Sequence, residues 1–550
     1  YLEICGGSVY ITNLYLSELQ DDLGHLSTSS GENLVFACNL GNWLPLAGFF
    51  YDSKCIGGPQ RTILFGAFLT LVGYLGLWLV SSNQLAVPYG LLLILWFLWG
   101  HGSSYFDCAA VSTSVYNFRS DRGRVIGLVK SFYGLSGSIL TQVFDAFFKS
   151  AGCAPSFLLF LGTGLPLLAS VCAPVTQRVD RPVDAMGGIG CESPHCLSTS
   201  SRFRYGYLFV LMLALTLMAV GLLRAFTPLK DSSAFSYVVL GCVCLSLMLL
   251  LLLAHGGGSS ISQQHLRLFE PTEPVSPFLE AAPSYASSVA LDGEIERSSR
   301  GGQPQSQHNE AQASWPRAPQ TSSPTVLTSV RTLNFWLLWL TVFVGCGGGL
   351  VLLNHIQKIV AAQQADPAHG GSVARAESTS SILVSLISVF NCLGRMAAGI
   401  GSDALRANVS RPIFVMLACF GMAMSHLLLL GAQNEAALYA GSCLGGFAYG
   451  SLWSLMPIVA SDLFGISNFA STYNSLALAV SAASLTFATT LASRNYDMHA
   501  RAGVSHAKSC YGNSCYQLTH LIVVASCFAG ALCSLLLFFR TRSFYFPKHH

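Results

Sequence analysis

The chain has 550 residues, of which 52% are hydrophobic and only 10% are charged, and its formal net charge is +3. Soluble domains usually carry about 25% charged residues, whereas a surface that faces lipid needs none. The composition therefore excludes an ordinary soluble globular protein and predicts a membrane protein. The nearly neutral charge also gives no sign of a nucleic-acid-binding surface.

A helix that crosses the hydrocarbon core of a membrane needs about 20 mostly apolar residues. The sequence has about 14 such segments, taken here in chain order. They cover residues 1–16, 33–51, 60–81, 86–116, 122–148, 155–173, 205–224, 233–254, 333–361, 378–402, 411–431, 435–461, 464–493 and 518–540. Because the chain begins at Tyr1 inside the first segment, we expect that helix to be truncated and the native N-terminus to lie upstream.

Two polar stretches divide these segments. Residues 256–330 are rich in Ser, Pro, Gln, Glu and Gly without apolar periodicity, which predicts a disordered linker. We therefore predict an all-α polytopic membrane protein with two pseudo-symmetric six-helix bundles. The predicted parts are a first bundle (1–173), a cytoplasmic loop (174–204), two additional helices (205–255), a disordered cytoplasmic linker (256–330) and a second bundle (331–543).

The distribution of Lys and Arg predicts the orientation, because cytoplasmic loops carry an excess of both. With a cytoplasmic N-terminus, most loop Lys and Arg residues fall on the cytoplasmic side, together with the C-terminal tail and the linker. The polar stretch that holds Cys510 and Cys515 then faces away from the cytosol, where a disulfide between them is a candidate. Cysteines within apolar runs, such as Cys242 and Cys419, are interpreted as small buried side chains.

A short motif occurs twice, each time between the second and third helices of a six-helix half. Its form is G-x-x-x-D, followed by a short loop and an Arg where the next helix starts. The Gly lets two helices touch, and the Asp can accept hydrogen bonds from a neighbouring helix N-terminus or from an Arg. We predict a gating latch that forms in one conformation and breaks in the other. Its members are Gly48, Asp52 and Arg61 in the first half, and Gly399, Asp403 and Arg411 in the second.

Further residues carry a family resemblance that covers nearly all of the helical chain and omits the linker. They include Gly7–Tyr10 with Tyr15, Asn117–Gly123, Gly127–Gly137, Gly347–Leu350 with Asn354, Asn391–Arg395 through Asp403, Gly446–Gly450 through Gly465, and Tyr473 with Asn474. The pattern resembles the major facilitator superfamily, and more closely its nodulin-like branch, which includes plant nuclear-fusion-defective-type proteins. The resemblance implies facilitated or ion-coupled movement of a small solute. It also implies the two additional helices between the bundles. No set of residues in the sequence indicates which solute is carried.

Ionisable residues within membrane helices are costly and are functional hypotheses by default. Asp107 lies about 18 Å above Arg119 along one predicted helix, and Lys130 lies about 12 Å above Arg122 along the next, which runs antiparallel. The two side chains are therefore expected at similar depths. They either pair, or Lys130 attracts an anionic solute while Asp107 takes a proton. The alternatives are a structural ion pair and a cytoplasmic water-filled vestibule.

Other polar residues are weaker candidates. Arg395 precedes Asp403 by two helical turns, and we assign it to the latch rather than to solute contact. Asn354 either hydrogen-bonds a solute or joins two helices, and His355 either titrates near neutral pH or is structural. The residues expected to line a solute cavity are Tyr10, Asn13, Tyr449, Trp453 and Asn474.

The sequence lacks the Walker, H-E-x-x-H and G-x-S-x-G motifs, so we predict neither an enzyme nor a cofactor or metal site. The favoured function is a gradient-driven or facilitative transporter of a small organic solute, with an anion and a co-transported proton as candidates. The alternative is a transporter-like receptor or sensor that signals through the linker. We expect a monomeric functional unit in the bilayer, and no lipidation or retention signal chooses between the plasma membrane and an internal membrane.

Overall fold

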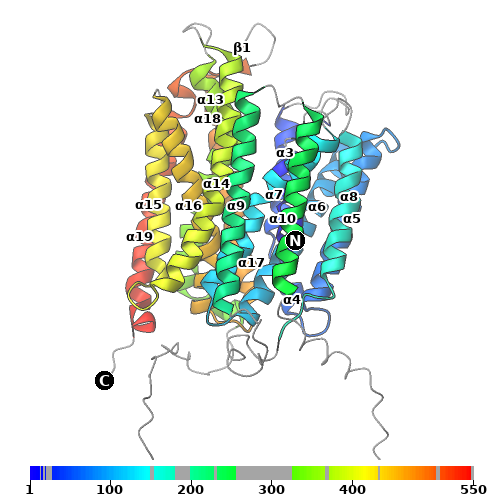
Figure 1. Cartoon of the computed structure of the whole chain (residues 1–550). Coiled ribbons are helices and arrows are strands. Elements are labelled where there is room, and N and C mark those ends of the chain that lie inside the picture. Colours follow the sequence, from blue (N-terminus) through cyan, green and yellow to red (C-terminus); the bar gives the residue numbers. More distant parts are fainter. Residues whose placement is uncertain are drawn as a thin grey trace, which may run out of the picture.

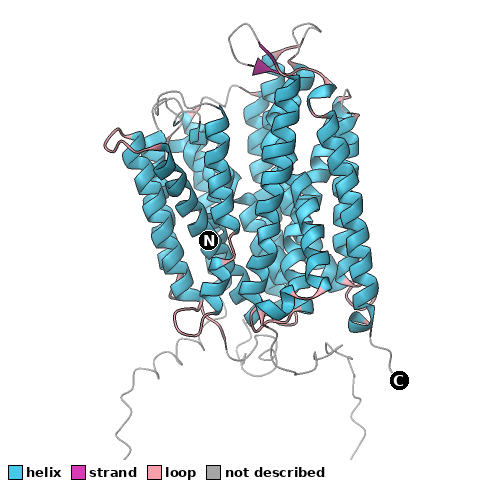
Figure 2. Ribbon diagram, turned by 180° about the vertical axis from the view of Figure 1, so that it is seen from behind, coloured by secondary structure: helices cyan, strands magenta, loops and turns pink. Residues whose placement is uncertain are grey.

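The structure, a computed structural model, is a bundle of long helices whose axes are roughly parallel (Figures 1 and 2). It describes residues 1–12, 14–16, 19, 28–148, 154–179, 199–227, 232–255, 325–365, 371–431, 434–502 and 508–546. The predicted linker and parts of the predicted loop over 174–204 lie outside the described residues, as does Asn13.

The helices of the N-terminal part are α1 (Leu2–Gly6), η1 (Gly7–Ile11), α3 (Thr28–Trp43), α4 (Leu46–Asp52), α5 (Pro59–Ser81), α6 (Tyr89–Asn117), α7 (Arg122–Phe147), α8 (Ala154–Cys172), α9 (Thr199–Phe226) and α10 (Ser233–His255). The C-terminal part has α12 (Val326–Val330), α13 (Leu333–Gln364), α14 (Val373–Ala404), α15 (Arg411–Leu430), α16 (Glu435–Leu463), α17 (Phe469–Ala483), η6 (Ser484–Ala492), α18 (Ser493–His499), η7 (Asn513–Cys515) and α19 (Gln517–Tyr545). The strands β1 (Arg501–Ala502) and β2 (Lys508–Ser509) pair antiparallel.

Within the described residues, eleven helices are long and apolar enough to cross a membrane. The eleven do not include α6 and α7, which have 29 and 26 residues and carry Asp107 and Lys130. The structure therefore confirms an all-α polytopic fold, and the count of 14 spans stays a prediction.

Two expected helices are interrupted. The helix expected over residues 33–51 is split into α3 and α4, because Pro45 has no backbone N–H with which to continue the helical hydrogen bonds. The helix expected over 464–493 begins at Phe469 and passes through η6, a π-helical segment, before it ends in α18 at His499. Both interruptions lie in helices that meet at the interface described next.

The helices form two halves that meet along two lines of contact. Helices α3, α5, α6 and α8 pack together in the first half, and α14, α15, α16 and α19 pack together in the second. Across the interface, α7 packs on α14 and α4 packs on α17. The additional helix α9 contacts both α7 and α14, so it lies beside one of the two lines of contact. Residues at these two lines of contact therefore change their neighbours when the halves move relative to each other.

The two ends of the bundle differ. The hairpin β1–β2 lies at one end, whereas α4 and the last turn of α19 lie at the opposite end (Figure 1). The sides of a membrane that these two ends face stay a prediction.

Candidate functional site

The first copy of the repeated motif connects the two halves at the end of the bundle that holds α4. The side chain of Asp52 accepts hydrogen bonds from the backbone N–H and the hydroxyl of Ser471, both at 2.8 Å, in the first turn of α17. A Cβ atom at Gly48 would lie 2.3 Å from the carbonyl oxygen of Ala470, so a glycine is required for this approach. Asp52 thereby satisfies an unpaired N–H at the N-terminus of a helix in the other half.

The second copy makes the corresponding contact in the reverse direction. Asp403 accepts a hydrogen bond from the backbone N–H of Arg124 at 2.8 Å, in the first turn of α7. A Cβ atom at Gly399 would lie 2.5 Å from the carbonyl oxygen of Gly123. Each half therefore uses the same motif to bind a helix N-terminus of the other half, which gives the interface a pseudo-twofold pattern.

The two arginines of the motif behave differently. Arg411 is buried and joins Asp403, at 2.5 Å, to both carboxylate oxygens of Asp462, each at 2.7 Å. Arg61 is exposed and donates to the carbonyl oxygen of Cys55 at 2.8 Å, and its predicted membership of the latch stays a prediction. Arg178, which follows the first six-helix set in the sequence, lies 3.7 Å from Asp52 instead.

A second group of charges lies deeper in the bundle, on the contact surface of the halves. Lys130 forms a buried ion pair with Asp107, as the depth argument expects. The other carboxylate oxygen of Asp107 accepts a hydrogen bond at 2.7 Å from the hydroxyl of Tyr473, which belongs to α17 in the other half. The ammonium group of Lys130 also lies 5.2 Å from the ring centroids of Tyr133 and Trp453. Asp107 thus links the two halves through a charge.

Arg395 lies within this central group. It is fully buried, and its guanidinium donates to the side-chain oxygen of Asn391 at 3.0 Å, the backbone carbonyl of Lys130 at 2.7 Å and the hydroxyl of Tyr10 at 3.4 Å. Its place about 12 Å along α14 from Asp403 puts it near the depth of Lys130. The contacts of Arg395 in this structure are therefore with the central group, and its predicted role in the latch stays a prediction.

Aromatic side chains surround these charges. Trp453 stacks against Trp43 of the opposite half with ring centroids 4.6 Å apart, and Tyr449 lies beside Trp453 at 6.2 Å. Tyr10 meets Tyr133 edge to face at 5.5 Å. The predicted candidates Tyr10, Tyr449 and Trp453 thus gather with Asp107, Lys130 and Arg395. We define these six residues, with Tyr133, Tyr473 and Glu3, as the central cluster.

Three other candidates lie outside the central cluster. Asn354 is exposed on the surface of α13, and Asn474 donates to the carbonyl oxygen of Ala470 within its own helix at 3.0 Å. His355 is buried near the far end of the bundle, where its ring nitrogens bond to the carbonyl oxygen of Ala488 at 3.1 Å and the hydroxyl of Tyr516 at 3.2 Å. These contacts fit the structural interpretation of His355.

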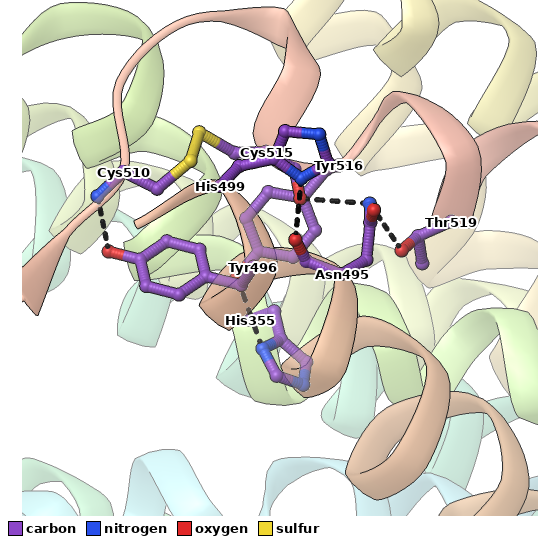
Figure 3. Close-up of a disulfide and its surroundings, with 8 residues drawn as sticks. All are labelled: His355, Asn495, Tyr496, His499, Cys510, Cys515, Tyr516 and Thr519. Atoms are coloured by element: carbon purple, nitrogen blue, oxygen red, sulfur yellow. Dashed lines mark hydrogen bonds between the residues drawn. A yellow bond between two sulfur atoms is a disulfide. The ribbon is translucent and has the colours of Figure 1, made fainter. Parts of the chain in front are cut away.

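The Cys510–Cys515 disulfide is present in the structure and lies above His355 (Figure 3). The backbone N–H of Cys510 donates to the hydroxyl of Tyr496, and Asn495 donates to the carbonyl oxygen of Cys515 at 3.0 Å. The disulfide therefore closes the loop before α19, and these hydrogen bonds attach the loop to α18, away from the central cluster.

Sequence reasoning missed several residues of the site. Glu3 was not recognised, although it is the charged residue of the first apolar segment, and it is only 3% exposed. Tyr473 was noticed only as part of the family resemblance, and Asp462 was not singled out. A charge inside an apolar segment was an available signal for Glu3, and Asp462 directly follows the expected segment 435–461. The role of Tyr473 depends on which helices meet across the interface.

Comparison with known protein families gives two matches. Residues 1–255 match the family described as "Nodulin-like", and residues 323–546 match "NFD4, C-terminal domain". Protein NUCLEAR FUSION DEFECTIVE 4 of Arabidopsis thaliana is 23% identical over 99% of this chain and 88% of its own length. Probable transporter MCH1 of Yarrowia lipolytica is 31% identical over 28% of this chain, a match that spans 32% of that protein.

Among solved structures, the proton:xylose symporter XylE, a major facilitator superfamily protein, aligns over 96% of this chain and 93% of its own. The TM-score is 0.52 and the sequence identity is 12%, a level at which the likeness concerns the fold alone. The two-half helical architecture is therefore the one that major facilitator proteins share.

Proposed function

Because this chain belongs to the nodulin-like branch of the major facilitator superfamily, we propose that it carries a small organic anion across its membrane by alternating access. At the coarser level, its relatives and fold make it a multi-pass membrane transporter. Beyond this, we propose the charge of the solute, the identity of the coupled ion and the residues that bind them.

The assignment of an anion as the solute rests on the contacts that the Arg395 side chain makes. Among the described residues, all of its hydrogen-bond partners are neutral oxygens, and no carboxylate lies within ion-pairing distance of it. A guanidinium without a carboxylate partner, buried between the halves, favours an anionic ligand that can accept two hydrogen bonds from it. Lys130 lies beside it, but its charge is neutralised by Asp107, so Arg395 supplies the excess positive charge of this site.

The same contacts suggest how the solute would be coupled to movement. Arg395 reaches Lys130 and Tyr10 of the first half, and Tyr473 reaches Asp107 across the interface. An anion that competes for Arg395 and Lys130 would replace contacts between the halves with contacts to itself. The Asp52 and Asp403 latches would then hold or release one end of the bundle as the halves rock.

A proton is the coupled ion that this cluster suits best. Its carboxyl groups, Asp107 and Glu3, are buried and can take up a proton. In the absence of any ATP-binding motif in the sequence, an ion or solute gradient is the energy source that we propose.

Uptake by the purified full chain in liposomes tests this function. Labelled lactate, succinate, alanine and glucose serve as probes with different charges, with and without an imposed pH gradient. We expect saturable uptake of at least one carboxylate and its loss in Arg395→Gln. The matched control is Arg375→Gln, because Arg375 lies on the same helix, α14, but is exposed and paired with Glu435. Uptake of glucose rather than of either carboxylate would contradict the anion assignment.

A further inference from the structure

We propose that Glu3 binds the coupled proton and shares it with Asp107. This inference rests on the proposed function, because it assigns a residue to the proton in anion transport. Glu3 takes part in neither the ion pairs nor the latch contacts described above.

The first observation is the isolation of the Glu3 carboxyl group. Glu3 is only 3% exposed, and among the described residues neither of its carboxyl oxygens receives a hydrogen bond. Such a group is far more costly to bury as an ion than as a neutral acid. The geometry therefore favours a protonated Glu3 in the conformation of this structure.

The second observation is what surrounds Glu3. The groups whose charges act on it are Asp107 on α6, Lys130 on α7 and Arg395 on α14. Tyr133 on α7 and Tyr473 on α17 are close enough to interact with its charge, and α8, which also packs on α1, has no charged residue. Glu3 thus faces both halves.

The cations near Glu3 are already engaged. Lys130 is bonded to Asp107, and the guanidinium of Arg395 donates to Asn391, Lys130 and Tyr10. Within the described part of the chain, the Glu3 side chain makes no hydrogen bond, but Asp107 lies among the groups that surround it, and two carboxyl groups can hydrogen-bond to each other only when one of them carries a proton. One proton shared between Glu3 and Asp107 therefore lets one carboxyl group donate a hydrogen bond and the other accept it.

This arrangement gives a reason for coupling. When Glu3 is protonated, Lys130 and Asp107 neutralise each other and Arg395 leaves one positive charge in excess, which attracts an anion. When Glu3 loses the proton, its negative charge cancels that excess. Proton binding and anion binding therefore strengthen each other, and thermodynamic linkage makes the effect reciprocal. The direction is that lower pH raises the affinity for the anion.

Infrared spectroscopy of the purified full chain tests the proton site without any solute. A protonated carboxyl group gives a C=O stretching band that an ionised one lacks. We expect the difference spectrum between acid and alkaline buffer to contain such a band that is missing in Glu3→Gln. The band should return at a shifted frequency in Glu3→Asp, and it should persist in Glu435→Gln, where the carboxyl group is exposed. A spectrum unchanged by Glu3→Gln would overturn the proposal.

Transport separates this inference from the proposed function. With labelled lactate or succinate, Glu3→Gln should lose the stimulation of uptake by an inward pH gradient but keep exchange of the probe at equal pH. Gradient stimulation that survives in Glu3→Gln would overturn the role of Glu3. If neither probe moves through the wild-type protein, the anion assignment fails, and the infrared result alone decides whether Glu3 binds the proton.

Discussion

The Asp107–Lys130 ion pair illustrates how strongly a buried charge depends on its partner. Lys130 and Asp107 have side chains that are 1% and 7% exposed. Removing one partner of a buried pair leaves an uncompensated charge, which typically costs about 3–5 kcal/mol. We expect Lys130→Met to lower the free energy of unfolding in detergent by about this amount, and Lys130→Met/Asp107→Leu to regain most of it, as measured by chemical denaturation.

The control for this prediction is an exposed pair. Arg375 and Glu435 are 65% and 50% exposed, and exposed pairs contribute about 0.2–1 kcal/mol. Arg375→Gln is therefore expected to change stability only within that range. A loss in Lys130→Met no larger than in Arg375→Gln would show that Asp107 does not depend on Lys130 for its burial.

The two arginines of the repeated motif give a second residue-scale prediction. Arg411 holds two buried carboxylates, Asp403 and Asp462, whereas Arg61 bonds to a backbone carbonyl at the surface. We expect Arg411→Gln to cost about 3–5 kcal/mol of stability. Arg61→Gln should stay within about 0.5 kcal/mol of the wild-type protein. Equal effects of the two substitutions would mean that the repeat is symmetric in energy despite its asymmetric contacts.

At the scale of elements, close helix contact depends on single glycines. Gly399 and Gly401 lie on α14, but a Cβ atom at Gly399 would meet the Gly123 carbonyl at 2.5 Å, while one at Gly401 would meet only a Phe414 ring atom at 3.6 Å. We therefore expect Gly399→Ala to push α14 away from α7 and Gly401→Ala to be tolerated. Ser402 is a fully buried residue of the same helix, so thiol labelling of Ser402→Cys measures the opening. Faster labelling in Gly401→Ala than in Gly399→Ala would contradict the expectation.

The elements themselves were largely predictable from the sequence. The predicted spans 155–173, 411–431 and 435–461 correspond to α8 (Ala154–Cys172), α15 (Arg411–Leu430) and α16 (Glu435–Leu463). Runs of apolar residues fix such helices because a membrane leaves the backbone no other way to satisfy its hydrogen bonds. The π-helical segment η6 has no comparable local signal, so its position within the expected span 464–493 was not predicted.

The site was predictable only in part, for a physical reason. Asp107 and Lys130 lie on consecutive helices of one half, so helical rise alone places them at equal depth. Tyr473 and Arg395 join them from helices that are distant in the sequence, and only the packing of α7 on α14 and α4 on α17 brings them together. Helical rise also gave the depth of Arg395 relative to Asp403, but it could not reveal the partners that lie across the interface.

At the scale of the whole molecule, the two latches predict how the halves move. Asp52 and Asp403 each bind the first turn of a helix in the opposite half, so losing one leaves the other in place. We expect Asp52→Ala and Asp403→Ala each to increase the population that is open at this end, and the double variant to increase it further. Pulsed electron paramagnetic resonance between spin labels at the exposed residues Ile56 and Leu405 measures this as a longer distance.

A second pair of labels tests whether the movement is a rocking of the halves. Leu85 and Tyr511 are exposed near the opposite end, one in each half. If the halves rock as rigid bodies about the central cluster, the Ile56–Leu405 distance must lengthen while the Leu85–Tyr511 distance shortens. Asp121→Ala is the matched control, because Asp121 lies next to the same helix terminus but pairs with Arg124 of its own half. Lengthening at both ends in the double variant would indicate separation of the halves, and that result would contradict alternating access.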